Sequence, residues 1–193
     1  MSPLTHRRLS TRVLLVCGAL AAVHLLLHLA TVPVLTALAP LAPPLYALVA
    51  GVHSVMPFLA RRLTDVPGTA VLTSAVAAVF VSVSNGSGVI AVVPLVVTGA
   101  AIDLVVWRTH SGDRGAGRRY LLAAVVAGIA LFGLSLAVFS PEHLTPLILG
   151  GSLIGRVVGE LLAAVLSGAL VAALRHAGVG RAFGDPPQSN PSS

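Results

Sequence analysis

Two pairs of polar side chains interrupt the apolar first part of this sequence. His24 and His28 are four residues apart and therefore lie on one face of a helix, while Tyr46 and His53 are seven apart and share a face of the next. An ionisable side chain within a membrane span costs several kcal/mol unless it is paired or hydrated, so each is a candidate for function. The pattern predicts a cavity between the first two helices.

A second polar stripe lies near the C-terminal end, where Arg156 and Glu160 are again four residues apart. This spacing places them at ion-pairing distance on a helix, either as a structural pair or as a pair that faces a ligand. Asn85 and Ser87 lie in a tight polar turn, where they cap two helices or contribute to a binding site. Together with His28, Tyr46 and His53, these residues predict one polar pocket that opens outwards.

The histidines allow three interpretations. A histidine in a helix bundle is most simply hydrogen-bonded to a neighbouring carbonyl group, and the second possibility is that His24 and His28 line a cavity. Two histidines on one helix and His53 on another also resemble the ligands of a transition metal or a haem. No cluster of carboxylates or cysteines accompanies them, so we predict neither a metal site nor a cofactor.

The composition defines the elements that must position these residues. Of 193 residues, 56% are hydrophobic and 9% are charged, and the mean hydropathy is +0.96. A soluble domain has about 25% charged residues. Charged residues are absent from positions 13–60, 66–102 and 120–141, which hold about five helices at about 20 residues per span. The sequence predicts an all-α, polytopic membrane protein.

We predict six transmembrane helices in one bundle over residues 13–176. The predicted helices cover residues 13–35, 45–60, 67–83, 89–107, 120–139 and 156–174, and residues 141–155 form a partly buried, re-entrant connection. Residues 1–12 are a basic cytoplasmic N-terminus. Residues 177–193 are rich in proline and serine and predict a disordered tail.

The arginines predict the orientation. With both ends in the cytoplasm, six crossings place every arginine except Arg156 on the inner side, as the positive-inside rule requires. Asp103, close to the inner end of the fourth helix, then pairs with a nearby arginine. The net charge of +6 fits anionic lipid headgroups of the bilayer better than nucleic acid. Lysine is absent and arginine, alanine and valine are abundant, which favours a GC-rich bacterial genome and the bacterial cell membrane.

Several classes of enzyme are excluded. The chain has no lysine, so it has neither a Walker A nucleotide site nor a Schiff-base lysine. Its single cysteine, Cys17, cannot form an intramolecular disulfide. No nucleophile, base and orienting residue recur at a catalytic spacing, so we predict that the chain is not an enzyme.

The length, the six helices and the lack of a nucleotide site resemble the S component of an energy-coupling factor (ECF) transporter. The local sequence agrees in Pro67-Gly68-Thr69-Ala70, in Gly99 to Leu104 and in Gly159 to Leu170. Members of this family carry a pair of alanines four apart on the first helix, and this chain has Gly18 and Ala22 at that spacing. The resemblance implies that these two residues dock onto a partner, whereas packing within the bundle is the simpler alternative.

The resemblance also implies a function and its partners. The chain would capture a vitamin or a vitamin precursor at the outer side, through His28, Tyr46, His53, Asn85, Arg156 and Glu160. It would deliver that molecule inwards with a transmembrane coupling protein and two cytoplasmic ATPase subunits. Two alternatives remain, a haem- or metal-binding membrane protein and a membrane scaffold subunit without a ligand.

Overall fold

The computed structural model describes residues 10–85, 89–110, 112–137 and 145–178, and these residues fold into α-helices and one short 3₁₀ helix without a strand. The predicted all-α fold class is therefore confirmed. The elements are α1 (Thr11–Leu41), α2 (Pro43–Ala50), η1 (Gly51–Ser54), α3 (Val55–Thr64), α4 (Thr69–Asn85), α5 (Val89–Val105), α6 (Ala116–Leu136) and α7 (Pro146–His176).

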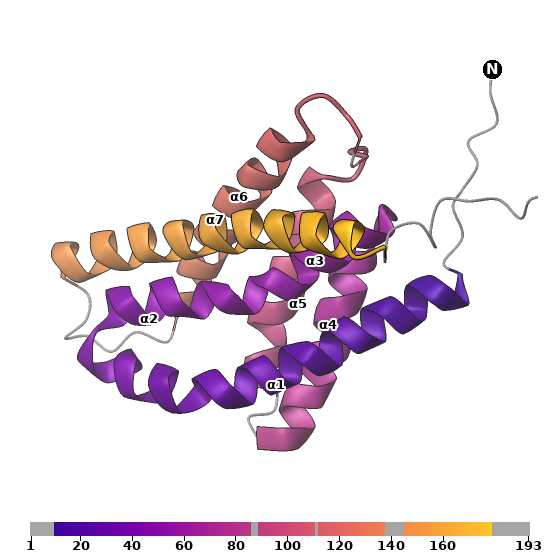
Figure 1. Cartoon of the computed structure of the whole chain (residues 1–193). Coiled ribbons are helices and arrows are strands. Elements are labelled where there is room, and N and C mark those ends of the chain that lie inside the picture. The colour runs from indigo at the N-terminus through magenta and orange to yellow at the C-terminus, as the bar shows by residue number, and fades with distance from the viewer. Residues whose placement is uncertain (1–9, 86–88, 111, 138–144, 179–193) are drawn as a thin grey trace, which may run out of the picture.

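The helices form two layers (Figure 1). Helices α1, α2–η1–α3 and α7 run side by side, with α2–η1–α3 in the middle and in contact with both neighbours. Helices α4, α5 and α6 cross behind them, and α4 packs on α1 while α6 packs on α7. Small residues on the facing surfaces, such as Ala70, Ala123 and Ala164, are fully buried and allow this close packing.

Four segments are long and apolar enough to cross a membrane by length and composition. They are Thr11–Leu41, Pro43–Thr64, Ala116–Leu136 and Pro146–His176, whereas α4 and α5 have 17 residues each. Many large apolar side chains of the long helices point outwards; Leu15, for example, is 68% exposed. These features support a multi-pass membrane protein. The count of six spans and the cytoplasmic location of both ends remain predictions.

The first helix is longer than its sequence predicts. Ser10 caps α1 by accepting a hydrogen bond from the Val13 amide (3.3 Å), and the helix continues through Pro33 and Pro40 to Leu41. Ala42 alone separates it from α2, which begins with Pro43 at a position where the missing amide proton has no helical partner. The gap of residues 36–44 between the first two predicted helices is therefore reduced to one residue.

The predicted re-entrant connection is wrong where the structure describes it. Helix α7 is continuous from Pro146 to His176, and Thr145 caps it by accepting from the Ile148 amide at 3.4 Å. Residues 141–144 lie outside the described residues. The glycines that suggested a break, Gly150, Gly151 and Gly155, lie inside the helix. Gly151 and Gly155 are tolerated there because α2 packs against them.

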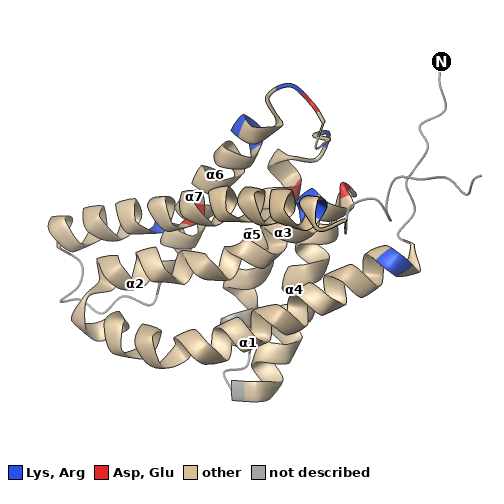
Figure 2. Cartoon of the chain, in the orientation of Figure 1, with Lys and Arg blue, Asp and Glu red and all other residues tan. Residues whose placement is uncertain are grey.

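Most of the described arginines gather at one end of the bundle. They lie at the start of α1, at the end of α3, before and within the first turns of α6, and at the end of α7, and Figure 2 shows these charges on one side of the molecule. Arg156 is the exception, since it lies in the middle of α7. We refer to this side as the arginine-rich end; its cytoplasmic location follows from the positive-inside rule alone.

Candidate functional site

A cavity of about 500 Å³ lies between the two layers. Residues of α1, α2, η1, α4, α5, α6 and α7 contribute to its wall, so nearly the whole bundle takes part. Most of the lining is apolar, including Leu35, Val81, Leu131 and Leu134. A few polar groups in an apolar wall are typical of pockets for small molecules.

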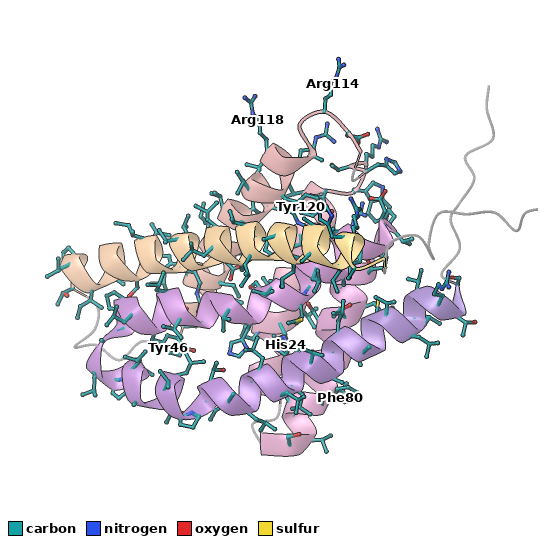
Figure 3. All side chains as sticks on the ribbon, in the orientation of Figure 1. His24, Tyr46, Phe80, Arg114, Arg118 and Tyr120 are labelled. Atoms are coloured by element: carbon teal, nitrogen blue, oxygen red, sulfur yellow. The ribbon has the colours of Figure 1, made fainter. Side chains whose placement is uncertain are left out.

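The structure brings four of the six predicted site residues to this one cavity: His28, Tyr46, His53 and Arg156. They come from α1, α2, η1 and α7, which are distant in sequence. In Figure 3, Tyr46 and His24 point into the space between α1 and the α2–η1–α3 segment. Their role in binding a ligand remains a prediction.

Of the other two predicted residues, Glu160 does not line the cavity wall, and the side chain of Asn85 is not described. Glu160 is fully buried on α7, where one carboxylate oxygen accepts a hydrogen bond from the Ser54 hydroxyl at 2.8 Å. Asn85 is the last residue of α4, but its side chain and Ser87 lie outside the described residues.

Three histidine rings form a row beside the cavity. The His53 ring centroid lies 5.3 Å from that of His24 and 5.2 Å from that of His28. One His53 nitrogen is 3.2 Å from the Thr31 hydroxyl, which itself donates to the carbonyls of residues 27 and 28. His24 is fully buried, and neither of its ring nitrogens makes a well-formed hydrogen bond to a described residue.

This row does not form a metal site in the part of the chain that the structure describes. No group of three or more histidine, cysteine, aspartate or glutamate side chains there is arranged to hold a metal ion. The rings instead pack against each other at tilts of 48° and 55°. The unpartnered nitrogens of His24 and His53 are the polar groups that such a row offers to a ligand or to water.

The predicted ion pair between Arg156 and Glu160 is absent among the described contacts, in which neither residue takes part in a salt bridge within 4.0 Å. Ser54 binds Glu160 instead, and the other carboxylate oxygen is buried without a partner. The Arg156 guanidinium carbon lies 5.9 Å from the centre of the Tyr46 ring. Among the described residues that line the cavity, Arg156 is the only one with a permanent positive charge.

A seam of glycines positions Arg156. Gly151, Gly155 and Gly159 follow each other at four-residue intervals on α7. Gly151 faces the ring of Pro44, whereas Gly155 and Gly159 face the backbone of α2 and η1. A Cβ atom at Gly155 would collide with the Pro44 carbonyl oxygen, and one at Gly159 would collide with that of Leu48. The predicted break at Gly151 and Gly155 did not take account of this regular spacing, which is a signal of close helix packing.

Sequence reasoning also missed Thr31, Ser54 and Thr98. Thr31 orients His53, Ser54 binds Glu160, and Thr98 lines the cavity while its hydroxyl donates to the Pro94 carbonyl. Hydroxyl side chains are common in membrane helices, where they often bond the preceding turn of their own helix. Their residue type therefore gave no signal that would have separated them from other serines and threonines.

The predicted docking residues lie on the outer surface of α1. Gly18 is half-buried and Ala22 is exposed, and a Cβ atom at Gly18 would meet nothing within 4 Å. Leu15 and Leu26, 68% and 67% exposed, extend the same surface. His24 points inwards from the opposite side of the helix. Ala22 thus faces away from the described part of the bundle, and the docking role of the two small residues remains a prediction.

Asp103 belongs to a separate, structural cluster at the arginine-rich end. Its carboxylate lies 3.5 Å from Arg61 and accepts a hydrogen bond from the Val71 amide at the start of α4 (2.8 Å). Arg61 is 1% exposed, lies 3.6 Å from Asp65 and donates to the carbonyls of Val106 and residue 109. The predicted pairing of Asp103 with a nearby arginine is confirmed.

Comparisons with known proteins give one informative result. No protein-family model matches the sequence, and a search of curated proteins found no match. Among solved structures, the chain is similar to one described as "Crystal structure of an S-component of ECF transporter". The TM-score is 0.80 at 22% sequence identity, and the alignment covers 91% of this chain and 90% of the other. At that identity, the likeness shows that this chain has the fold of an S component.

Proposed function

We propose that this chain is the substrate-capture subunit of an ECF-type transporter. The observation that carries the proposal is the cavity of about 500 Å³, which lies inside a fold like that of an S component and is lined by His28, Tyr46, His53 and Arg156. In this role the chain binds a small vitamin-like or precursor molecule at the outer side of a bacterial membrane and delivers it inwards. A coupling protein and two ATPase subunits supply the energy.

The lining indicates how a substrate would be held. Apolar side chains surround most of the substrate and exclude water, which strengthens each polar contact. Arg156 offers charged donors, Tyr46 offers a ring face and a hydroxyl, and His53 is held in orientation by Thr31. Behind the cavity wall, the Ser54 hydroxyl donates to one carboxylate oxygen of Glu160 and so fixes the carboxylate. The other oxygen of Glu160 has no described partner.

Docking onto the coupling protein would use the outer surface of α1. A small-residue surface lets another helix approach closely, and Gly18 and Ala22 provide one that no element in the described part of the chain covers. The neighbouring exposed leucines add apolar contact area on both sides. Docking and substrate binding therefore use opposite faces of the same helix.

The first experiment identifies what the protein carries. We would purify the full chain in detergent, release any bound molecule by denaturation, and record its mass and absorption spectrum. A stoichiometric vitamin-like molecule supports the proposal. A haem or a metal ion would support the histidine-based alternative, and an empty protein that also binds no candidate vitamin would support the scaffold alternative.

A variant series then assigns the molecule to the cavity. Arg156→Gln should weaken its binding at least tenfold, because a charged hydrogen bond contributes about 1.5–3 kcal/mol. Arg118→Gln is the matched control, since it removes the same charge from an exposed position near the start of α6. Equal affinities for the two variants would contradict the assignment.

A further inference from the structure

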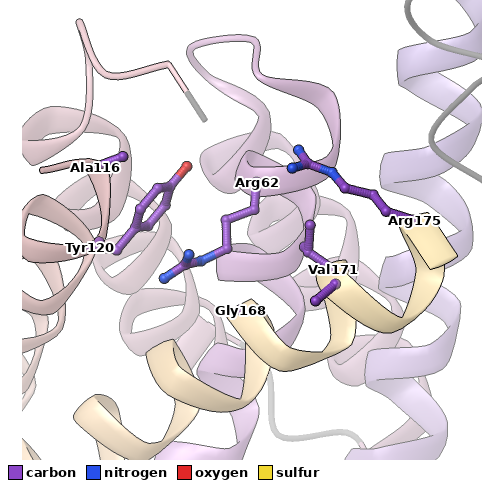
Figure 4. A pocket seen from close by; sticks show the side chains of 8 residues that line it. Arg62, Ala116, Tyr120, Gly168, Val171 and Arg175 are labelled. Atoms are coloured by element: carbon purple, nitrogen blue, oxygen red, sulfur yellow. The ribbon is translucent and has the colours of Figure 1, made fainter. Parts of the chain in front are cut away.

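A second cavity, of about 180 Å³, lies at the arginine-rich end, away from the candidate substrate site. The end of α3, the start of α6 and the last turns of α7 form its wall. Its polar lining consists of Arg62, Tyr120 and Arg175, and small residues such as Gly117 and Gly168 complete it (Figure 4). The volume is several times the roughly 30 Å³ that one water molecule occupies.

The wall of this cavity includes a tyrosine whose buried hydroxyl has no described hydrogen-bond partner. Tyr120 is 1% exposed, and its hydroxyl makes no hydrogen bond to a described residue. An unsatisfied buried polar group costs about 1–3 kcal/mol, so native structures usually provide it with a ligand or water. In Figure 4 this hydroxyl points into the space beside Arg62.

The arginines make the cavity electropositive. The Arg62 guanidinium carbon lies 3.8 Å from the centre of the Tyr120 ring, and one of its nitrogens donates to the Ala164 carbonyl at 3.1 Å. These contacts hold the guanidinium in a fixed position. Arg175, in the last turn of α7, is exposed and extends over the same space.

Two carboxylates lie nearby, and both are close to Arg61. Asp65 and Asp103 lie 3.6 Å and 3.5 Å from Arg61, which is not among the residues that line the cavity. Among the described residues, the cavity wall contains two guanidinium groups and no carboxylate. A phosphate group matches this set, because arginine binds its oxygens with paired N–H donors and the tyrosine hydroxyl can donate a third hydrogen bond.

We propose that the cavity formed by Arg62, Tyr120 and Arg175 binds a phosphate group, supplied by an anionic lipid headgroup or by free phosphate. Its place at the ends of three helices puts it at the level where headgroups of a bilayer lie. The bound phosphate would join α3, α6 and α7 at the end of the bundle opposite Tyr46. The site is independent of the substrate cavity, and its test does not require the substrate to be known.

The test measures binding of short-chain phosphatidylglycerol and of inorganic phosphate to the full chain in a neutral detergent. Arg175→Gln should weaken binding about tenfold, and Tyr120→Phe should weaken it several-fold because it removes only the hydroxyl. Arg118→Gln is the control, because it removes one positive charge from the same end of the bundle and does not line the cavity. Its affinity should change by less than twofold.

The outcomes separate the two sources and the competing explanation. Binding of phosphatidylglycerol alone that depends on Arg175 and Tyr120 identifies a lipid headgroup site. The same dependence for inorganic phosphate identifies a free-anion site. Equal effects of Arg175→Gln and Arg118→Gln, with none from Tyr120→Phe, would mean general attraction to a basic surface and would overturn the proposal. Melting temperatures without ligand verify that each variant is folded.

Discussion

Replacing Gly155 by alanine should push α7 away from α2 and so disturb the candidate substrate cavity. The added Cβ atom would collide with the Pro44 carbonyl oxygen and would lie 3.4 Å from the Leu48 amide nitrogen. These are backbone atoms, so no side-chain rotation can relieve the overlap. The two helices must separate, and Arg156, the next residue, must move with α7.

The magnitude follows from comparison with Gly150→Ala. Both substitutions gain up to about 1 kcal/mol of helix propensity, but a Cβ atom at Gly150 would meet nothing within 4 Å. Overpacking costs about 1–3 kcal/mol, and the rigid backbone contact at Gly155 favours the upper end. About 3 kcal/mol corresponds to roughly 6–12 °C in melting temperature for a chain of this size.

Thermal unfolding in detergent measures the difference directly. We expect Gly155→Ala to melt well below Gly150→Ala, and to bind the substrate more weakly because Arg156 is displaced. If the two variants melt at the same temperature, α2 and α7 are not in backbone contact at this position. The glycine seam would then have no role in placing the cavity.

Three further predictions concern other parts of the bundle. Gly18→Leu or Ala22→Leu should abolish co-purification with a coupling protein while substrate affinity stays unchanged. If the complex still forms, this face of α1 is not the docking surface. Glu160→Ala should lower substrate affinity about tenfold by removing a fixed buried acceptor, and an unaltered affinity would make Glu160 structural. Asp103→Ala should destabilise the fold by about 1–3 kcal/mol in thermal unfolding, because it removes one of the two carboxylates beside the buried Arg61 and the acceptor of the Val71 amide; an unchanged melting temperature would show that the pair contributes little.

The helical fold was predictable because apolar composition and charge-free runs dictate it. The four cavity residues were found because a polar side chain in an apolar run is costly, whatever its partners. His28 is four residues from His24, and Tyr46 is seven from His53. These spacings predicted that each pair shares one helix face, without any knowledge of the packing. Local spacing carries this much information because a helix fixes which residues share a face.

What could not be predicted depends on contacts between distant segments. The i, i+4 spacing favoured pairing of Arg156 with Glu160, but Ser54, 106 residues away in sequence, binds the carboxylate instead. Glycines at the start of α7 predicted a break because glycine has a low helix propensity in an isolated helix. Only the adjacent Pro44 and Leu48 show that the same glycines permit contact between two helices.

The helices of this bundle differ greatly in length, and this difference has a consequence for the surrounding bilayer. At about 1.5 Å per residue, α1 and α7, with 31 residues each, extend about 46 Å, whereas α4 and α5, with 17 each, extend about 26 Å. A hydrocarbon core of about 30 Å matches neither length. In a bilayer the long helices must tilt, and the predicted six-span arrangement requires the bilayer to be thinner beside α4 and α5. Acyl-chain length therefore acts on the inclination of the whole bundle, with thinner membranes favouring a greater tilt of α1 and α7.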